Sequence, residues 1–407
     1  MIRNTKGNQT CACSTLTRPN GGIAHPLQRQ RCPMLASGLI AMSFGWPMGI
    51  GMAAAKATSN SPEKKNMTYR RSDGTLYQER QKLPWPADKP FRILAIDGGG
   101  IKGILPATIL ANLENNLPDN QGLARHFDMI AGTSTGGIIA VGLSLGVSAK
   151  TVLDLYLTKG DRIFPSAPWM FKKLGRKIGT AKQLFCRRYD PTVLDHELAR
   201  IIGGRKFGEA KCRLVIPAFD QNTEPYIFKT AHHPDYKRDW KENALTVARA
   251  TSAAPAFLEG LEHSGRRFWD GGVFANNPVM MAVVDTLACY EVPRRNIHVL
   301  SIGCATDKPA LAKHHLTAGL WGWRNAHAVA SSLQNHDATG QAGLLIGRHH
   351  LLRIDAELPY SIAMDDYASA KEKLPDVGEY LWNENREVLL SMATPLASDF
   401  EAVYNDR

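Results

Sequence analysis

The sequence has little of what a metal-bound or disulfide-linked domain needs. Of its seven cysteines, the last four are widely spaced, lie beside apolar residues and form no CxxC pair. This spacing argues against a zinc site and favours reduced, buried thiols of the kind found in cytosolic proteins. Collagen-like repeats, heptads and internal duplications are absent as well. With 44% hydrophobic and 21% charged residues, the chain has the composition of a globular protein rather than a disordered one.

The main part of the chain also carries little net charge, although the whole protein is basic at a formal +11. Residues 1–90 hold 13 Lys and Arg against four Asp and Glu, whereas the remaining 317 residues hold 36 against 34. A nucleic-acid-binding domain needs a basic face on its folded part, so we expect no nucleic-acid polymer as a partner. The basic leader fits contact with anionic lipid or plain solvation.

One long uncharged run lies in this leader, at residues 32–55. Its length is sufficient to cross a bilayer, and its basic flanks also resemble those of a secretory signal. Four glycines and two prolines interrupt it, with Pro47 near the middle, which weakens both interpretations. A third alternative is that synthesis starts at Met67 and that residues 1–66 are not made. Membrane anchor, signal peptide and absent leader stay open.

A proline-rich stretch, LPWPADKP at residues 83–90, can continue neither a helix nor a strand. We therefore expect three regions. Residues 1–89 form a basic leader and linker that is disordered, membrane-associated or not translated. Residues 90–304 form a folded α/β domain, and residues 305–407 form a mainly helical C-terminal extension packed on it.

Short apolar runs alternate with helical patterns along the folded domain. Strands are predicted at residues 91–96, 127–131, 213–219, 226–228 and 299–303, and helices at 103–117, 138–145, 149–159, 192–202, 245–252 and 278–290. This alternation predicts an α/β fold with a mostly parallel sheet that helices cover on both faces. Ligands of such sheets bind at the carboxyl ends of the strands, where two glycine-rich turns fall in this sequence.

The second of these turns is Gly132-Thr133-Ser134-Thr135-Gly136, which fits the pattern G-x-S-x-G. An apolar strand is expected before it and an apolar helix after it, the context in which this pattern presents a nucleophilic serine. Gly132 and Gly136 leave room for a sharp elbow, and the start of the following helix favours a developing anion. We predict that Ser134 is a nucleophile; the alternative is a glycine-rich turn without chemistry.

The first turn, DGGGIKG at residues 97–103, matches G-x-G-x-x-G after a strand. A dinucleotide-binding fold would require a second strand that ends in an acid about 20 residues later, but a loop stands there. A phosphate loop of the sugar-kinase kind would require a second phosphate loop, and none is recognisable. We interpret Gly98, Gly99 and Gly100 as an oxyanion hole whose backbone N–H groups approach a carbonyl oxygen, with Lys102 adding a positive charge.

A third motif, FWDGG at residues 268–272, is a short strand that ends in an acid and a glycine pair. Alone, Asp-Gly is more typical of a turn. Beside the other two motifs it supplies a base, because a carboxylate within hydrogen-bond reach of a serine hydroxyl can take its proton directly. We predict that Asp270 activates Ser134 for acyl transfer.

These motifs, together with ARATSAAPAFL at residues 248–258, resemble those of the patatin-like phospholipases over about residues 91–290. The resemblance implies a three-layer α/β/α sandwich that deacylates phospholipids and other lipid esters. It implies a Ser–Asp dyad without histidine or cofactor, with Ser134 as nucleophile, Asp270 as base and Gly98–Gly100 as the oxyanion loop. The family usually has Arg where this chain has Lys102, so the charge is kept but the bidentate geometry of a guanidinium is not.

A narrower resemblance rests on YIFKTAHHPDYKRDW at residues 226–240, on DGGVFANNPVMMAV at 270–283 and on VLSIGC at 299–304. These segments are similar to the patatin-like effectors of bacterial anti-phage (CBASS) systems. The resemblance implies that a cyclic dinucleotide switches on the degradation of membrane phospholipids. It also implies a cytoplasmic enzyme that acts at the inner membrane surface, to which the leader could anchor it.

The effector-binding residues stay unassigned. His232, His233, Lys237 and Arg238 could bind phosphates, although a solvated basic loop is the commoner meaning of such a cluster.

Three alternatives to a gated Ser–Asp hydrolase stay open. A Ser-His-Asp triad could use His298, His314, His315 or His336, but none stands in a glycine-flanked loop after a strand. A constitutive or secreted patatin-like esterase would lack nucleotide control. A non-catalytic lipid- or nucleotide-binding module would need neither the serine nor the aspartate. A homo-oligomer is compatible with each of them.

Overall fold

The structure is a computed structural model that describes residues 80–118, 121–165, 189–306 and 326–405. The uncharged run at residues 32–55 and the alternatives for residues 1–66 lie outside the described residues. In the described part of the chain, no helix combines the length and apolar character that a membrane span requires.

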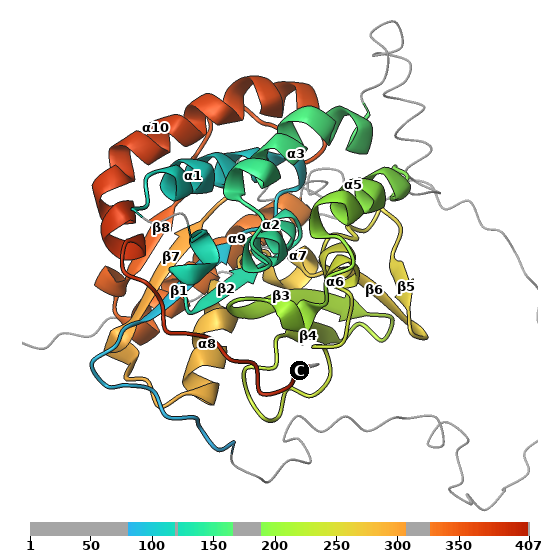
Figure 1. Cartoon of the computed structure of the whole chain (residues 1–407). Helices are drawn as coiled ribbons and strands as arrows, with labels where there is room; N and C mark the ends of the chain where they lie inside the picture. The colour runs from blue at the N-terminus through green and yellow to red at the C-terminus, as the bar shows by residue number, and fades with distance from the viewer. Residues whose placement is uncertain (1–79, 119–120, 166–188, 307–325, 406–407) are drawn as a thin grey trace, which may run out of the picture. The chain divides into compact units, whose positions relative to one another are not determined.

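A mixed sheet forms the centre of the fold, with strand order β5-β6-β3-β2-β1-β7-β8 and β4 beside β3 (Figure 1). Strands β3, β2, β1, β7 and β8 run parallel, whereas β4 and β6 run antiparallel to β3, and β5 antiparallel to β6. The strands are β1 Phe91–Ile96, β2 Met129–Gly132, β3 Arg213–Asp220, β4 Pro225–Lys229, β5 Leu261–His263, β6 Arg266–Asp270, β7 Ile297–Ile302 and β8 Leu351–Ile354. The predicted α/β fold with a mostly parallel sheet is confirmed.

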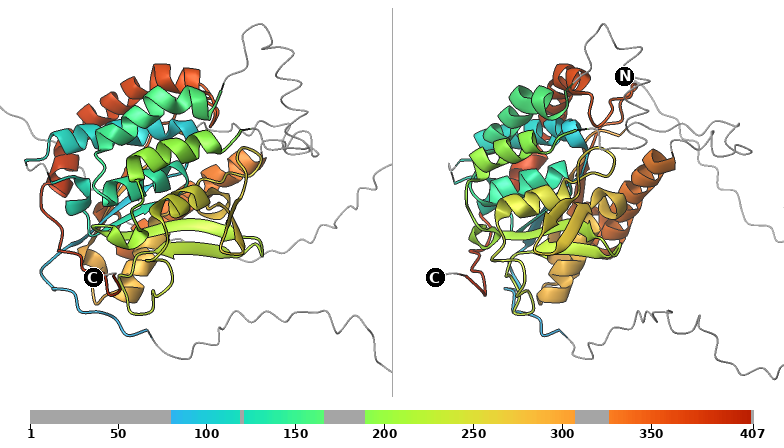
Figure 2. Two further views of the ribbon diagram at one scale, coloured as in Figure 1. Left: turned by 45° about the vertical axis from the view of Figure 1, so that its right-hand side comes forward. Right: turned by 90° about the vertical axis from the view of Figure 1, so that its right-hand side faces the viewer.

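Helices cover both faces of the sheet (Figures 1 and 2). One core lies between the sheet and α1, α2, α3, α5, α6 and α10, and a second lies between the sheet and α8 and α9. The helices are α1 Ile104–Asn115, α2 Thr135–Ser144, α3 Ala149–Ile163, α5 Thr192–Ile202, α6 Ala244–Thr251, α7 Gly272–Ala275, α8 Val279–Cys289, α9 Ala326–Ile346 and α10 Tyr367–Ala393. This is the three-layer α/β/α arrangement that the motif resemblance implies.

Strand β1 shows why the central strands have continuous apolar sequences. Leu94 and Ile96 are buried in the first core, and Ile93 and Ala95 in the second. Because both faces of a central parallel strand are covered, neither face needs polar residues. The apolar run ends where the chain leaves the sheet for the glycine-rich loop.

The described residues from 326 onward are mainly helical, but they also contribute β8 to the sheet. Leu351–Ile354 pairs in parallel with β7, and this register places Arg353 beside Ser301. At the other end of the domain, Trp85 is buried against Phe91 and Tyr290, so the proline-rich stretch is already part of the packed structure. Sequence analysis missed β5 and β8, which have only three and four residues.

Candidate active site

The sheet register brings the serine and the aspartate together across β3. Ala131 of β2 pairs with Val215 of β3 in parallel, and Ala218 of β3 pairs with Asp270 of β6. Ser134 lies three residues beyond Ala131, and Ala218 lies three residues beyond Val215. The two functional candidates therefore reach the same level on opposite sides of one strand.

Ser134 occupies a sharp elbow between β2 and α2. Its φ of 56° and ψ of −122° lie in a region that residues with side chains rarely adopt. The flanking glycines make the elbow sterically possible: a Cβ on Gly132 would overlap the Gly136 carbonyl, and a Cβ on Gly136 would overlap the Ile96 carbonyl. Backbone strain of this kind concentrates at functional sites, and here it presents the serine side chain to a pocket.

The backbone of Ser134 is held by Thr251, the last residue of α6. The Thr251 hydroxyl accepts the Ser134 N–H at 3.0 Å and donates to the Pro217 carbonyl at 2.6 Å. Thr251 is fully buried, so both bonds are sheltered from water. Although Thr251 belongs to a segment that the family resemblance includes, sequence reasoning assigned it no role, because nothing local shows that its hydroxyl meets the elbow.

The side chains of Ser134 and Asp270 lie close together and line one pocket. The Asp270 Oδ1 accepts the Gly272 N–H at 2.7 Å, which fixes the carboxylate at the turn after β6. Burial raises the pKa of Asp270 to about 6, and the nearby Ser134 hydroxyl and Gly272 N–H limit the rise. A carboxylate with this pKa is ionised at neutral pH and is more basic than an ordinary aspartate, as a general base should be.

The loop Gly98–Gly100 passes directly beside the serine, since a Cβ on Gly98 would lie 3.2 Å from the Ser134 Cβ. The Gly98 N–H is already used, because it donates to the Asn276 carbonyl at 3.0 Å. Gly99 and Gly100 line the same pocket as Ser134, and their amides donate no hydrogen bond within the described ranges. Of the three predicted oxyanion glycines, these two have free donors.

Lys102 is not brought to the serine. Its ammonium donates to the Ala305 carbonyl at 2.8 Å, and the residue does not line the catalytic pocket. The 3₁₀ turn Gly100–Gly103 directs its side chain to the segment after β7. The Lys102 side chain therefore ties the glycine loop to the segment after β7. The expectation that Lys102 belongs to the oxyanion hole does not match this geometry.

Asp97, which precedes the glycine loop, is anchored by Arg353 of β8. The guanidinium binds both carboxylate oxygens, at 2.9 Å and 2.6 Å, and also contacts Ser301 and Asp355. Burial raises the pKa of Asp97 to about 6, although the guanidinium opposes the rise. The start of the oxyanion loop is thus tied to a residue 256 positions further along the chain, a link that no local motif reveals.

A pocket of about 620 Å³ opens beside Ser134 and Asp270, and we refer to it as the catalytic pocket. Its lining is mainly apolar and includes Ile138, Tyr156, Ile163, Phe164, Leu194, Phe219, Pro255, Phe257, Leu258, Val273 and Met364. Each methylene buried in such surroundings contributes about 0.8 kcal/mol. The pocket therefore suits an acyl chain whose ester carbon reaches the serine.

The histidine candidates for a triad lie elsewhere. His298 on β7 packs against the ring of His350 at a centroid distance of 4.7 Å, and His336 lines a different, polar pocket. His314 and His315 lie outside the described residues. Among the residues that the structure describes, no histidine lines the catalytic pocket.

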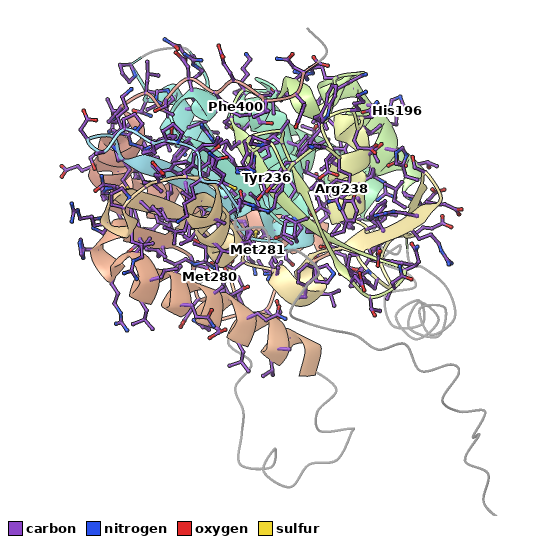
Figure 3. The ribbon with its side chains drawn as sticks, turned by 90° about the horizontal axis from the view of Figure 1, so that it is seen from below. His196, Tyr236, Arg238, Met280, Met281 and Phe400 are labelled. Carbon is purple, nitrogen blue, oxygen red and sulfur yellow. The ribbon has the colours of Figure 1, made fainter. Side chains whose placement is uncertain are left out.

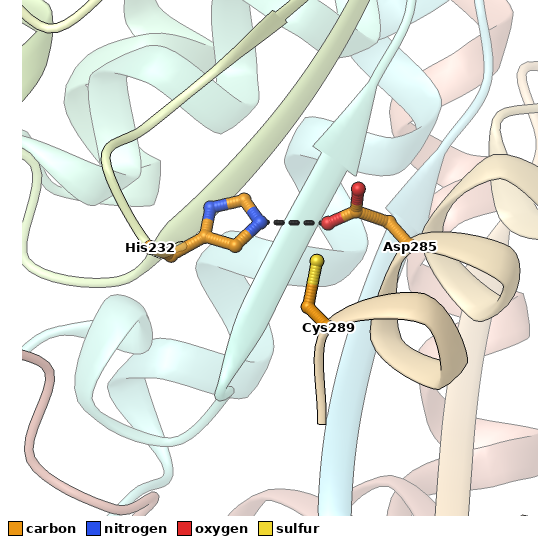
Figure 4. Close-up of side chains that lie close together, drawn as sticks. All are labelled: His232, Asp285 and Cys289. Atoms are coloured by element: carbon orange, nitrogen blue, oxygen red, sulfur yellow. Dashed lines mark hydrogen bonds and ion pairs between the residues drawn. The ribbon is translucent and has the colours of Figure 1, made fainter. Parts of the chain in front are cut away.

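A buried cluster of His232, Asp285 and Cys289 lies on the second face of the sheet, with ligand atoms within 4.8 Å of one another (Figure 4). Asp285 already binds His232 Nε2 at 2.6 Å, the Lys229 ammonium at 2.5 Å and the Tyr236 hydroxyl at 2.6 Å. Burial alone would raise the pKa of Asp285, but His232 and Lys229 hold it well below its usual range. Because the ammonium would repel a metal ion, the cluster is best described as a buried ion pair.

Figure 3 labels Tyr236 and Arg238, which belong to the same segment, residues 226–240, as His232. His232 and His233 are buried and hydrogen-bonded within the protein, the latter to the Gln81 carbonyl at 2.9 Å. Arg238 pairs with Asp239 at 2.8 Å. The two histidines are therefore not presented to a phosphate, contrary to one expectation from the sequence.

Comparison with known proteins places this geometry in context. The sequence profile of the family described as Patatin-like phospholipase matches residues 94–283. A cGAMP-activated phospholipase of Vibrio cholerae is 30% identical over 309 residues, covering 69% of this chain and 86% of the relative. One from Escherichia coli is 31% identical, covering 71% and 82%. Patatin-like protein 2 of Oryza sativa subsp. indica is 32% identical, covering 58% and 66%.

Proposed function

The chain belongs to the patatin-like phospholipase family, a class of serine hydrolases, and from this premise we propose that it cleaves acyl esters of membrane phospholipids with Ser134 as nucleophile and Asp270 as base. The observation that supports the assignment is that the Ser134 hydroxyl and the buried Asp270 carboxylate lie together in one pocket. The pair opens onto an apolar pocket of about 620 Å³, which accounts for a lipid substrate.

The dyad supports a two-step acyl transfer. In the first step the Ser134 oxygen bonds to the acyl carbon while Asp270 takes the hydroxyl proton. The tetrahedral intermediate then expels the lysophospholipid alkoxide, which receives that proton from Asp270. In the second step Asp270 takes a proton from water, the resulting hydroxide attacks the acyl-serine, and the fatty acid leaves as Ser134 recovers its proton.

Gly99 and Gly100 supply the oxyanion donors in this proposal. Their amides are unused among the described residues and line the pocket beside the serine. Removing one such donor typically lowers kcat by about 10²–10³-fold. Gly98 has a different part, since its bond to the Asn276 carbonyl holds the loop in place.

A cyclic dinucleotide is the proposed activator. Two relatives that cover about 70% of this chain are named cGAMP-activated phospholipases, and the motif resemblance points the same way. The enzyme would act as an anti-phage effector that degrades membrane lipid once the nucleotide is made. Its place of action is the cytoplasmic surface of the inner membrane, where the basic leader would contact anionic lipid.

The test measures fatty-acid release by the purified full chain from vesicles of phosphatidylethanolamine and phosphatidylglycerol. Cyclic GMP–AMP, cyclic di-AMP and cyclic di-GMP are each compared with no nucleotide. We expect release that depends on one of these nucleotides and disappears in Ser134→Ala, whereas Ser391→Ala, an exposed serine on α10, behaves as wild type. Equal release without nucleotide would indicate a constitutive esterase, and no release under any condition would contradict hydrolysis.

A further inference from the structure

A second pocket of about 520 Å³ lies between α9, β8 and the segment after β7, and we refer to it as the polar pocket. Its volume falls within the range of about 300–1,000 Å³ that small-molecule sites occupy. Most of its lining residues have polar or charged side chains, among them Asn335, His336, Thr339, Arg348, Asp355 and Glu357. It therefore differs in kind from the catalytic pocket, and no step of ester hydrolysis uses it.

Arg348 is the group in this pocket that is open to an anion. Its side chain is exposed, and it forms no ion pair within the described ranges. Arg353, by contrast, uses four hydrogen bonds on Asp97, Ser301 and Asp355. A guanidinium binds phosphate in a bidentate manner. Arg348 is thus the natural phosphate ligand, while Arg353 is committed to the protein.

The pocket offers more than a phosphate contact. Glu357 adds a carboxylate to the lining, a group of the kind that contacts the amino edge of a base. His336 and Thr339 add a ring and a hydroxyl along one face of α9. A nucleotide, which carries both phosphates and bases, matches this mixture of groups better than inorganic phosphate does.

Helix α9 is a shared wall between the two pockets. Ser331 lines the catalytic pocket, whereas Asn335 lines the polar pocket. The Asn335 Oδ1 accepts a hydrogen bond from the Asn276 amide at 3.1 Å. Asn276 in turn lines the catalytic pocket, and its carbonyl accepts the Gly98 N–H. Two residues therefore connect the polar pocket to the oxyanion loop.

A second connection runs through β8. Arg353 lines the polar pocket and binds both carboxylate oxygens of Asp97, the residue immediately before the loop. A ligand that contacts α9 and β8 together would bias the position of both anchors. Such a ligand activates the enzyme if it binds the state with the oxyanion loop in its active position more tightly than the state with the loop in an inactive position.

We propose that the polar pocket binds the activating cyclic dinucleotide and sets the oxyanion loop through Asn335–Asn276 and Arg353–Asp97. This assignment rests on the nucleotide control in the proposed function. A rival site is the cavity of about 350 Å³ beside Arg238. Its cations are already paired, Lys229 with Asp285 and Arg238 with Asp239, so that it offers less to an anion.

Two variants test the site independently. Arg348→Glu reverses the charge of the phosphate ligand. Gly340→Phe fills the pocket without a clash, because a Cβ at Gly340 meets nothing within 4 Å, and phenylalanine is a better helix former than glycine. Gly204→Phe is the matched control, since Gly204 also faces open space and lies outside the pocket. Arg238→Gln tests the rival cavity.

The measurement is binding of cyclic GMP–AMP to the full chain by isothermal titration calorimetry, repeated with cyclic di-AMP and cyclic di-GMP. Loss of a charged hydrogen bond weakens binding about tenfold or more, so we expect at least that for Arg348→Glu. We expect no measurable binding to Gly340→Phe and wild-type affinity for Gly204→Phe and Arg238→Gln. Circular dichroism confirms that each variant is folded.

The outcomes separate the site from the function. Wild type that binds no cyclic dinucleotide would contradict nucleotide control and this site together. Wild-type affinity in both Arg348→Glu and Gly340→Phe would overturn the site while control stands, and loss of binding in Arg238→Gln alone would move it to the rival cavity. Asn335→Leu at saturating nucleotide should show reduced maximal activation; full activation would overturn the relay to Asn276.

Discussion

At the scale of single residues, the proposed mechanism depends on the protonation of Asp270. The carboxylate can take the serine proton only when it is ionised, and burial raises its pKa to about 6. We expect kcat/KM on a soluble ester to fall about tenfold per pH unit below pH 6 and to level off above it. A stopped-flow or plate assay between pH 4.5 and 8 measures this profile.

Acid unfolding must be separated from this loss of rate. Asp97 and Asp270 both have folded-state pKa values of about 6, above the ordinary aspartate pKa of 3.8. A carboxyl with a raised folded pKa binds its proton more tightly when folded, so these two groups favour the folded state as the pH falls from 6 to 4. Circular dichroism should therefore stay constant while the rate falls. A rate that does not change between pH 7 and pH 5 would rule out Asp270 as the base.

At the scale of secondary-structure elements, Thr251 links α6, β3 and the serine elbow through one hydroxyl. Thr251→Val keeps the shape of the side chain but removes its hydrogen bonds to the Ser134 N–H and the Pro217 carbonyl. Each buried group without a partner costs about 1–3 kcal/mol. We expect a lower melting temperature and a kcat reduced by about 10-fold or more, with KM little changed.

Thr251→Ser is the matched control, since it keeps the hydroxyl and removes only the methyl that packs against Gly137. It should recover most of the kcat. If Thr251→Val loses stability but keeps the wild-type kcat, Thr251 is a packing residue and does not position the nucleophile.

The elements that the sequence predicts well are those with a strong local pattern. The bounds of β1 and α5 match the prediction, because an apolar run ends abruptly at Asp97 in one and helical periodicity is clear in the other. Strands β5 and β8 were missed, since a three- or four-residue strand is defined by its neighbour in the sheet rather than by its own residues. Strand β5 pairs with β6 and strand β8 pairs with β7.

The candidate site divides in the same way. Ser134 and Asp270 each stand in a glycine-rich turn after a strand, so their residue types and flanks were enough to find them. Thr251, Asn276 and Arg353 act through contacts between distant segments, and no spacing in the sequence indicates these. For Lys102 the sequence misleads in the other direction. It follows the glycine loop directly, so its charge was expected beside the oxyanion, but the side chain binds the Ala305 carbonyl instead.

At the scale of the whole molecule, the region after residue 305 is part of the catalytic architecture. It supplies Met364 and Ser331 to the catalytic pocket. It also supplies Arg353, which holds the residue before the oxyanion loop. The expected domain boundary near residue 304 marks where the sequence motifs end, but the sheet and the pocket continue beyond it. We therefore expect variants in α9 and β8 to affect activity as well as packing.

The central claim is that one serine, activated by one aspartate and no histidine, carries the reaction. The most direct measurement is the rate at which a fluorophosphonate modifies the nucleophile, with mass spectrometry to identify the peptide. We predict that Ser134 alone is modified, that Ser134→Ala is not modified at all, and that Asp270→Asn slows modification by about 10²–10⁴-fold. Modification of another residue, or an unchanged rate in Asp270→Asn, would contradict the account.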